Sequence, residues 1–70
     1  MPREAVVSSA IAAVEYDDAG QWLGIELTNG HAYRYRDVPR STYEAFMAAD
    51  SKGRFYNDHI RDIFLYERLR

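Results

Sequence analysis

The feature that most constrains this chain is a pair of alternating segments joined by Asn29-Gly30. From Trp22 to Leu27, three aliphatic residues alternate with other residues, which is the period-two pattern of a strand with one buried face. His31 to Arg36 alternates again, with two tyrosines on one face. Asn-Gly favours a two-residue type I′ turn with positive backbone angles at both positions. We therefore predict an antiparallel hairpin.

A further strand and turn precede this hairpin. Ile11 to Tyr16 is rich in apolar and aromatic residues, as expected of a short strand. Asp17 to Gly20 is a cluster of turn formers, and Gly20 is the residue that we expect to take a positive backbone angle. The first residues, 1–8, are expected to form an N-terminal arm that frays until Val6 and Val7 cover something. Residues 9–70 are expected to form the domain.

Two helices are predicted after the three strands. The sequence Asp37-Val38-Pro39 ends the last strand, and the first helix begins at Pro39 or at Ser41, which starts a capping-box pattern. This helix is expected to end near Ala49-Asp50. Its apolar stripe is formed by Tyr43, Phe46 and Met47, at i, i+3 and i+4, which can lie across the sheet.

The second helix is expected to run to Arg61, with Ser51 as its N-cap. Its apolar or amphipathic face is formed by Phe55, Tyr56, His59 and Ile60. In residues 63–70 the aromatic and branched side chains fall near strand spacing, so we predict a closing strand, with continued helix as the alternative.

The predicted fold is therefore α+β: a small single domain with a three-stranded antiparallel meander, two short helices and a closing C-terminal strand. The 70-residue chain is 47% hydrophobic, which is too apolar for intrinsic disorder. It contains no apolar run near the ~18 residues of a membrane helix and no stretch resembling a signal peptide. We expect a cytoplasmic domain that does not act at a membrane and is a monomer or weak homodimer.

Charge is unevenly distributed along the sequence. Residues 1–30 carry one base and five acids, whereas residues 31–70 carry eight bases and six acids. Eight of the nine bases are arginine, whose planar guanidinium suits phosphate and carboxylate groups. The net charge of −2 counts against a dedicated nucleic-acid module, which is normally basic. A local cationic surface remains compatible with this composition.

Tyr33 and Tyr35 are the first candidate binding residues. Aromatic side chains on a sheet face can stack on unpaired bases. The alternative, which we favour, is that both tyrosines pack under the helices. In that case Arg34 and Arg36 face outward, beside Trp22, where they either bind phosphate or form ion pairs with Glu15 and Glu26.

The start of the second helix is the other candidate site. Ser51, Lys52, Gly53 and Arg54 combine free backbone donors with two positive charges, a pattern that can bind an anion. The competing interpretation is a simple cap and turn. Tyr56 and Asn57 follow and can hydrogen-bond a ligand, although Asn57 can equally hold a neighbouring loop.

Catalytic chemistry has little support in these residues. The chain has no cysteine and only two histidines, without the spacing of a metal site. A set of Ser51, His59 and Asp62 is conceivable, but Ser51 is more simply a helix cap. We expect no enzyme activity, no cofactor and no metal.

These residues resemble the KTSC domain, a family of about sixty residues found alone in bacterial proteins and at the C-terminus of some lysyl-tRNA synthetases. The resemblance runs from Ser8 or Ser9 to Leu69. It rests on Tyr33-Arg34-Tyr35, which match the family's central Tyr-x-Tyr, and on Val38-Pro39. Further matches are Ser51-Lys52-Gly53-Arg54-Phe55-Tyr56-Asn57, Ile60 and the Tyr66 to Leu69 ending. Because the domain is attached to a tRNA synthetase in some proteins, the resemblance suggests RNA binding, while the function of the family is otherwise undetermined.

The sequence therefore favours a non-enzymatic binding module. RNA is the partner implied by the resemblance, and the alternative is a protein-interaction module with an aromatic and arginine surface. A nucleic-acid site would require the basic side chains to converge beside an exposed aromatic, whereas dispersal among carboxylates would favour a protein partner. The residues concerned are Arg34, Arg36, Lys52, Arg54 and Arg61.

Overall fold

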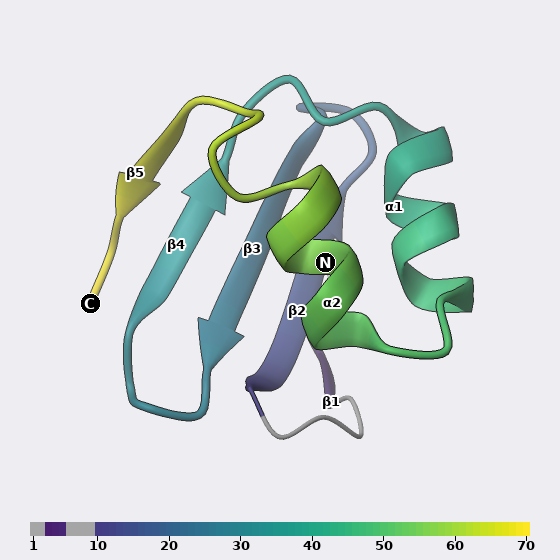
Figure 1. Ribbon diagram of the computed structural model, residues 1–70. Helices are drawn as coiled ribbons and strands as arrows, with labels where there is room; N and C mark the ends of the chain where they lie inside the picture. The colour runs from purple at the N-terminus through teal and green to yellow at the C-terminus, as the bar shows by residue number, and fades with distance from the viewer. Residues whose placement is uncertain (1–2, 6–9) are drawn as a thin grey trace.

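The computed structural model describes residues 3–5 and 10–70, and these form one antiparallel sheet packed against two helices (Figure 1). The sheet has the order β1-β2-β3-β4-β5, so each strand pairs with its neighbours in the sequence. The helices lie between β4 and β5 in the chain and cover one face of the sheet. The bounds are β1 Arg3–Ala5, β2 Ile11–Asp17, β3 Trp22–Leu27, β4 Ala32–Tyr35, α1 Arg40–Ala48, α2 Lys52–His59 and β5 Tyr66–Arg68.

Strand register places the apolar residues of the meander in rows on the helix-covered face. Tyr16 lies opposite Leu23, which lies opposite Tyr35. Directly opposite residues of antiparallel strands project to the same side, so the predicted inward face of the meander is confirmed. Tyr35 and Leu23 are at most 2% exposed, which makes this row the centre of the core.

Each helix contributes its apolar side to this core. In α1, Phe46 is fully buried, and the Tyr43 ring stacks on the Tyr16 ring with centroids 4.5 Å apart. The Tyr16 hydroxyl donates a hydrogen bond to the Val38 carbonyl oxygen at 2.7 Å. In α2, Tyr56 is buried. The predicted apolar stripe of the first helix is therefore confirmed.

The two hairpin turns differ from the expected ones. After β2 the positive backbone angle is at Gln21, with φ 55°, rather than at Gly20. Asp17 fixes this turn, because its carboxylate accepts a hydrogen bond from the Gly20 backbone N–H at 3.2 Å. Aspartate side chains commonly stabilise turns by binding nearby backbone N–H groups, and here the residue after the bonded Gly20 takes the left-handed angle.

The second turn is not type I′. Only Gly30 has a positive φ, of 94°, and its N–H donates to the Leu27 carbonyl at 3.1 Å. The Leu27 N–H donates in turn to the His31 carbonyl at 2.8 Å. This is a wider loop, a turn followed by a left-handed glycine, which is the next most common hairpin connection.

The ends of the other elements agree with the prediction in part. Helix α1 begins at Arg40 with Pro39 as its N-cap, which agrees within one residue with the predicted start at Pro39, and the alternative start with a capping box at Ser41 is wrong. Ser51 caps α2 as predicted: its hydroxyl accepts a hydrogen bond from the Arg54 N–H at 3.2 Å. The closing strand is confirmed as β5, although it has only three residues, and the helical alternative is wrong.

Strand β1 is an addition to the predicted fold. Its residues, Arg3–Ala5, belong to the predicted N-terminal arm, and they pair antiparallel with β2. The predicted covering role of Val6 and Val7 lies outside the described residues. In the described part of the chain, no helix is long and apolar enough to cross a membrane.

Candidate functional site: a tyrosine groove beside α2

Two adjoining hollows on the helix-covered side form the candidate site, which we call the tyrosine groove. Their volumes are about 790 and 280 Å³. Both are lined by Leu27, Asn29, Tyr56 and Arg61. The larger also contacts the beginning of α2, through Ser51, Gly53, Arg54, Asn57 and Asp58 among others. The smaller is completed by Tyr33, Tyr35, Asp62 and Tyr66.

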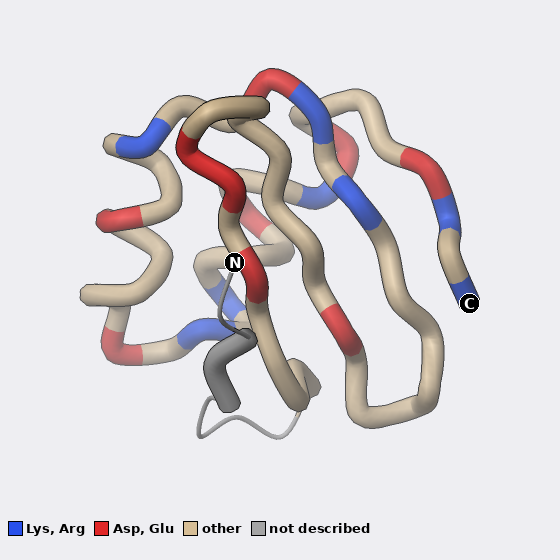
Figure 2. The backbone as a smooth tube through the Cα atoms, turned by 180° about the vertical axis from the view of Figure 1, so that it is seen from behind, with Lys and Arg blue, Asp and Glu red and all other residues tan. Residues whose placement is uncertain are grey.

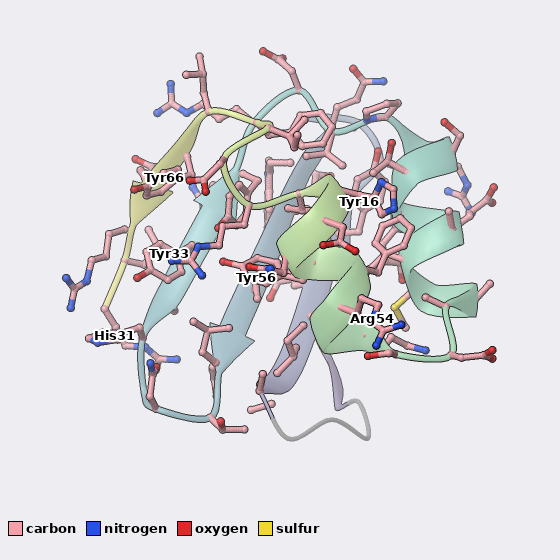
Figure 3. The ribbon with its side chains drawn as sticks, viewed as in Figure 1. Tyr16, His31, Tyr33, Arg54, Tyr56 and Tyr66 are labelled. Carbon is pink, nitrogen blue, oxygen red and sulfur yellow. The ribbon has the colours of Figure 1, made fainter. Side chains whose placement is uncertain are left out.

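Four tyrosines from three elements line the smaller hollow. Tyr33 and Tyr66 meet edge to face with ring centroids 5.5 Å apart, and Tyr66 is 54% exposed. In Figure 3 both rings lie on β4 and β5, and Tyr56 projects toward them from α2. The cluster therefore presents an exposed ring at the sheet edge, supported by half-buried and buried rings behind it.

Behind the exposed rings, two tyrosine hydroxyls form a buried pair. The hydroxyls of Tyr35 and Tyr56 are 2.5 Å apart, and either can donate. Burial is the main cause that raises the pKa of Tyr35 above its usual value, and the Tyr56 hydroxyl raises it further. Burial also raises the pKa of Tyr56. Both hydroxyls thus remain neutral at physiological pH and hold α2 against β4.

A polar stripe on α2 forms the opposite wall of the groove. Arg54, Asn57 and Arg61 are spaced i, i+3 and i+7, so they follow one side of the helix and the turn after it. The Arg61 guanidinium donates to the Asn57 side-chain oxygen at 3.4 Å. Within residues 3–5 and 10–70, neither arginine forms an ion pair. Asp58 and Asp62 also line the groove, so its lining carries no net charge.

The beginning of α2 serves mainly to join the helices. The Ser51 hydroxyl is occupied as the N-cap, and the Lys52 ammonium donates to the Ala49 carbonyl at 2.7 Å, which closes the loop after α1. Lys52 is absent from the groove lining, whereas Gly53 is part of it. The cap-and-turn interpretation thus accounts for Ser51 and Lys52.

Arg34 and Arg36 lie on the opposite, helix-free face of the sheet. Both guanidiniums contact the Glu67 carboxylate, at 3.6 and 3.5 Å, and the Arg34 guanidinium carbon is 4.5 Å from the centre of the Trp22 ring. The predicted neighbourhood of Trp22 and arginine is confirmed. The predicted ion-pair partners were wrong, because β5 brings Glu67 beside β4 and Glu26 binds Arg70 instead.

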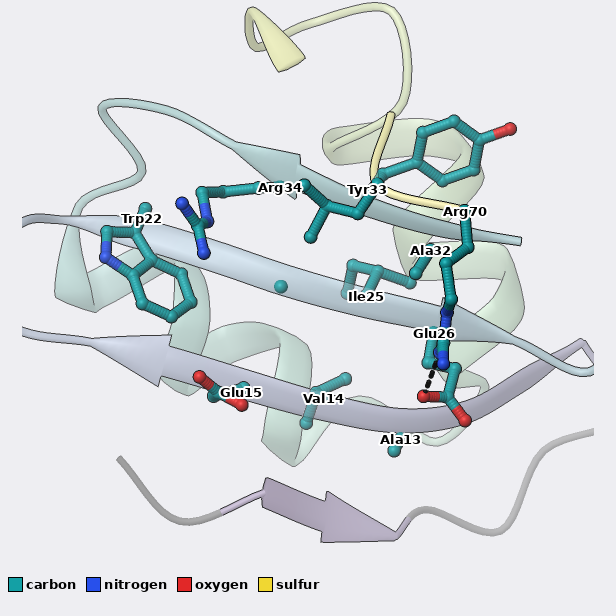
Figure 4. Close-up of a pocket in the computed structure, with 12 residues that line it drawn as sticks. Ala13, Val14, Glu15, Trp22, Ile25, Glu26, Ala32, Tyr33, Arg34 and Arg70 are labelled. Atoms are coloured by element: carbon teal, nitrogen blue, oxygen red, sulfur yellow. Dashed lines mark hydrogen bonds and ion pairs between the residues drawn. The ribbon is translucent and has the colours of Figure 1, made fainter. Parts of the chain in front are cut away.

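The helix-free face also has a shallow hollow, of about 350 Å³ (Figure 4). Three small residues on neighbouring strands line it: Ala13, Gly24 and Ala32. Three of its four charged residues form ion pairs within the described part of the chain: Glu26 with Arg70, as Figure 4 shows, and Arg34 with Glu67. The Arg34 guanidinium covers the Trp22 ring, so this face offers less to an aromatic or anionic ligand than the tyrosine groove does.

Seven of the ten candidate residues therefore line the tyrosine groove, and three do not. Those in the groove are Tyr33, Tyr35, Ser51, Gly53, Arg54, Tyr56 and Asn57. Arg34 and Arg36 lie on the other face, and Lys52 lies at the loop. Sequence reasoning missed Tyr66 and Asn29 as site residues. Tyr66 enters the site through the pairing of β5 with β4, where it lies opposite Tyr35, and local sequence patterns do not specify this register.

The geometry does not favour catalysis by Ser51, His59 and Asp62. Ser51 and His59 are at opposite ends of α2, which is about 12 Å long for eight residues. The Ser51 hydroxyl is also engaged by the backbone. In the described residues, no group of three or more histidine, aspartate or glutamate side chains is arranged to hold a metal ion.

The sequence of this chain is similar to those of known proteins. The chain is 42% identical over 59 residues to a protein of Tsukamurella paurometabola, covering 84% of this chain and 88% of that one. It is 36% identical over 61 residues to a lysine–tRNA ligase of Nostoc, covering 87% of this chain but only 11% of the ligase.

A solved structure agrees closely with the fold. The crystal structure of a KTSC domain protein from Yersinia pestis superposes with a TM-score of 0.92 at 36% identity, covering 99% of this chain and 97% of that one. The sequence profile of the KTSC domain matches residues 7–64, which include both Tyr33-Arg34-Tyr35 and all of α2. From these agreements in sequence and structure, we conclude that the chain belongs to the KTSC domain family.

Proposed function

We propose that this domain is a non-catalytic module that binds single-stranded RNA in the tyrosine groove. The observation that carries the proposal is the exposed ring of Tyr66, in edge contact with Tyr33, facing a stripe of arginine and amide side chains on α2. Exposed aromatic rings stack on unpaired bases, and arginine contacts phosphate or stacks on bases.

The relatives add a second line of support. Lysine–tRNA ligases of Nostoc and Trichormus contain a segment 34–38% identical to this chain. Those enzymes are named for an RNA substrate, and a domain shared with them is consistent with RNA as the ligand. We propose that the module acts in the cytoplasm, where such RNA is available.

The charges of the groove predict weak binding with a modest dependence on salt. The five basic side chains do not converge on one surface, which by the criterion of the sequence analysis counts against a nucleic-acid site and in favour of a protein partner. The proposal therefore depends on Arg54 and Arg61, the two of them that line the groove with the exposed Tyr66 ring. Two phosphate contacts to a single strand give a slope of about −1.4 in a plot of log affinity against log salt. Affinity should therefore fall about sevenfold between roughly 50 and 200 mM salt.

Fluorescence anisotropy with labelled ten-nucleotide uridine and adenosine RNAs tests the proposal. We expect Tyr66→Ala to weaken binding about tenfold, since loss of one stacked base costs about 1–3 kcal/mol. Tyr66→Phe keeps the ring and should bind like the parent protein. Arg61→Ala should lower the salt slope by about 0.7.

The matched control is Arg36→Ala, which removes an exposed arginine from the helix-free face and should leave RNA affinity unchanged. Thermal unfolding of each variant shows whether a loss of binding comes from unfolding. The proposal is wrong if the parent protein binds neither RNA at about 50 mM salt, or if Arg36→Ala weakens binding as much as Arg61→Ala does.

A further inference from the structure

Strand β5 leaves one side of its backbone open. The Leu65 carbonyl accepts from the Arg36 N–H at 2.8 Å, and the Leu69 N–H donates to the Ala32 carbonyl at 2.7 Å. Alternate residues of a strand direct their N–H and C=O groups to the same side. The backbone groups of Tyr66 and Arg68 therefore point away from β4, where the sheet ends.

The same edge concentrates exposed apolar side chains. In the part of the chain that the structure describes, the large hydrophobic residues that are exposed all lie between positions 63 and 69: Ile63, Leu65, Tyr66 and Leu69, which are 63%, 77%, 54% and 51% exposed. An exposed apolar edge is a template for another strand, and small soluble proteins normally protect such edges. This edge therefore has the character of an interaction surface.

The charge at this edge is positive. Arg34 and Arg36 share the single carboxylate of Glu67, whereas the Arg68 guanidinium donates to the Arg70 backbone oxygen at 3.2 Å and to the Nδ1 of His31 at 2.7 Å. Figure 2 shows the distribution from behind: basic residues lie along β4 and near the C-terminus, with one acidic residue, Glu67, on β5, and most acidic residues of the sheet lie on β2 and the turn after it. A second β5 would bring like charges together, whereas an acidic strand would be attracted.

We propose that the β5 edge binds an extended acidic segment of a partner protein by β-strand addition. The two faces of β5 define the segment. Leu65 and Leu69 lie on the helix-free side with Glu67, whereas Tyr66 and Arg68 lie on the other side. The partner strand alternates apolar residues, which contact Leu65 and Leu69, with carboxylates, which contact Arg68.

The test uses two synthetic peptides of opposite charge. One is acetyl-Glu-Val-Glu-Val-Glu-Val-Glu-amide, and the other has lysine in place of each glutamate. Titration into ¹⁵N-labelled protein, followed by NMR, should show that the glutamate peptide binds at least about tenfold more tightly than the lysine peptide. The amides of Tyr66 and Arg68 should shift most and become protected from hydrogen exchange.

Two variants test whether the charge of Arg68 determines which peptide binds. Arg68→Glu should reverse the preference, so that the lysine peptide binds more tightly. Arg61→Ala, in the tyrosine groove but not on the edge, should leave peptide binding unchanged. RNA binding and peptide binding are measured separately, so failure of one is distinguishable from failure of the other.

Three outcomes would overturn the proposal: equal affinity for both peptides, no binding of either at about 1 mM, or shifts confined to the helix-free hollow. Sedimentation of the protein alone tests the alternative occupant of this edge, which is a second copy of the chain. A concentration-dependent dimer that is lost in Leu65→Glu would assign the edge to a second copy of this chain instead.

Discussion

The two faces of the sheet have the same strands but different chemistry. The helix-covered face buries a row of aromatic and aliphatic side chains and leaves a groove where α2 stops short of β5. The helix-free face carries small residues and charged side chains that pair with one another. Arg34 and Arg36 already contact Glu67, and Arg34 covers the Trp22 ring, so we propose the tyrosine groove and not this face as the RNA site.

The largest contrast between the faces should be in stability. Ile25 is 1% exposed on the helix-covered face, and we expect Ile25→Ala to lower the free energy of unfolding by about 2–5 kcal/mol, because it leaves a cavity in a small core. Urea denaturation measures this loss. A loss below about 1 kcal/mol would contradict the assignment of this face as the core.

The buried hydroxyl pair should behave as a coupled unit. Tyr35→Phe alone leaves the Tyr56 hydroxyl without its partner, so we expect a loss of about 1–3 kcal/mol. The double variant with Tyr56→Phe should lose less than the sum of the two single variants. Strict additivity in the double-mutant cycle would show that the two hydroxyls do not interact.

Alkaline pH should also act through the helix-covered face. The pKa values of Tyr16, Tyr35 and Tyr56 are raised mainly by burial, so above about pH 10 these hydroxyls ionise in the unfolded chain before they ionise in the folded one. Stability should fall as pH rises, by up to about 1.4 kcal/mol per pH unit for each tyrosine. Denaturation from pH 8 to 11.5 should show a shallower fall in Tyr35→Phe, and an identical slope would contradict this cause.

The smallest effect should come from the helix-free face. A Cβ at Gly24 would lie 3.5 Å from the Trp22 ring and 3.7 Å from the Glu15 Cβ, which is ordinary contact. We expect Gly24→Ala to raise stability by about 0.4–1 kcal/mol, because alanine restricts the unfolded chain. Thermal unfolding measures the change. A lower melting temperature for Gly24→Ala than for the parent protein would contradict this expectation and would indicate that the hollow has to stay open.

Alternation of residues in the sequence was sufficient to predict the meander, its inward face and the outward arginines. It was not sufficient for the turns, because the left-handed residue is Gln21 rather than Gly20, whose N–H binds the Asp17 side chain, and alternation does not specify such a side-chain bond. It also missed the roles of Tyr66 and Glu67. Both depend on the pairing of β5 with β4, a contact between segments some thirty residues apart that local patterns do not specify.

The most direct test of the difference between the faces is NMR mapping of RNA on the labelled protein. A ten-nucleotide uridine RNA, titrated at about 50 mM salt, should shift the amides of Asn29, Tyr33, Asn57, Arg61 and Tyr66, while those of Trp22, Gly24 and Arg36 remain in place. Shifts concentrated at Trp22, Gly24 and Arg36 would contradict the account, because they would place the ligand on the paired charges of the helix-free face.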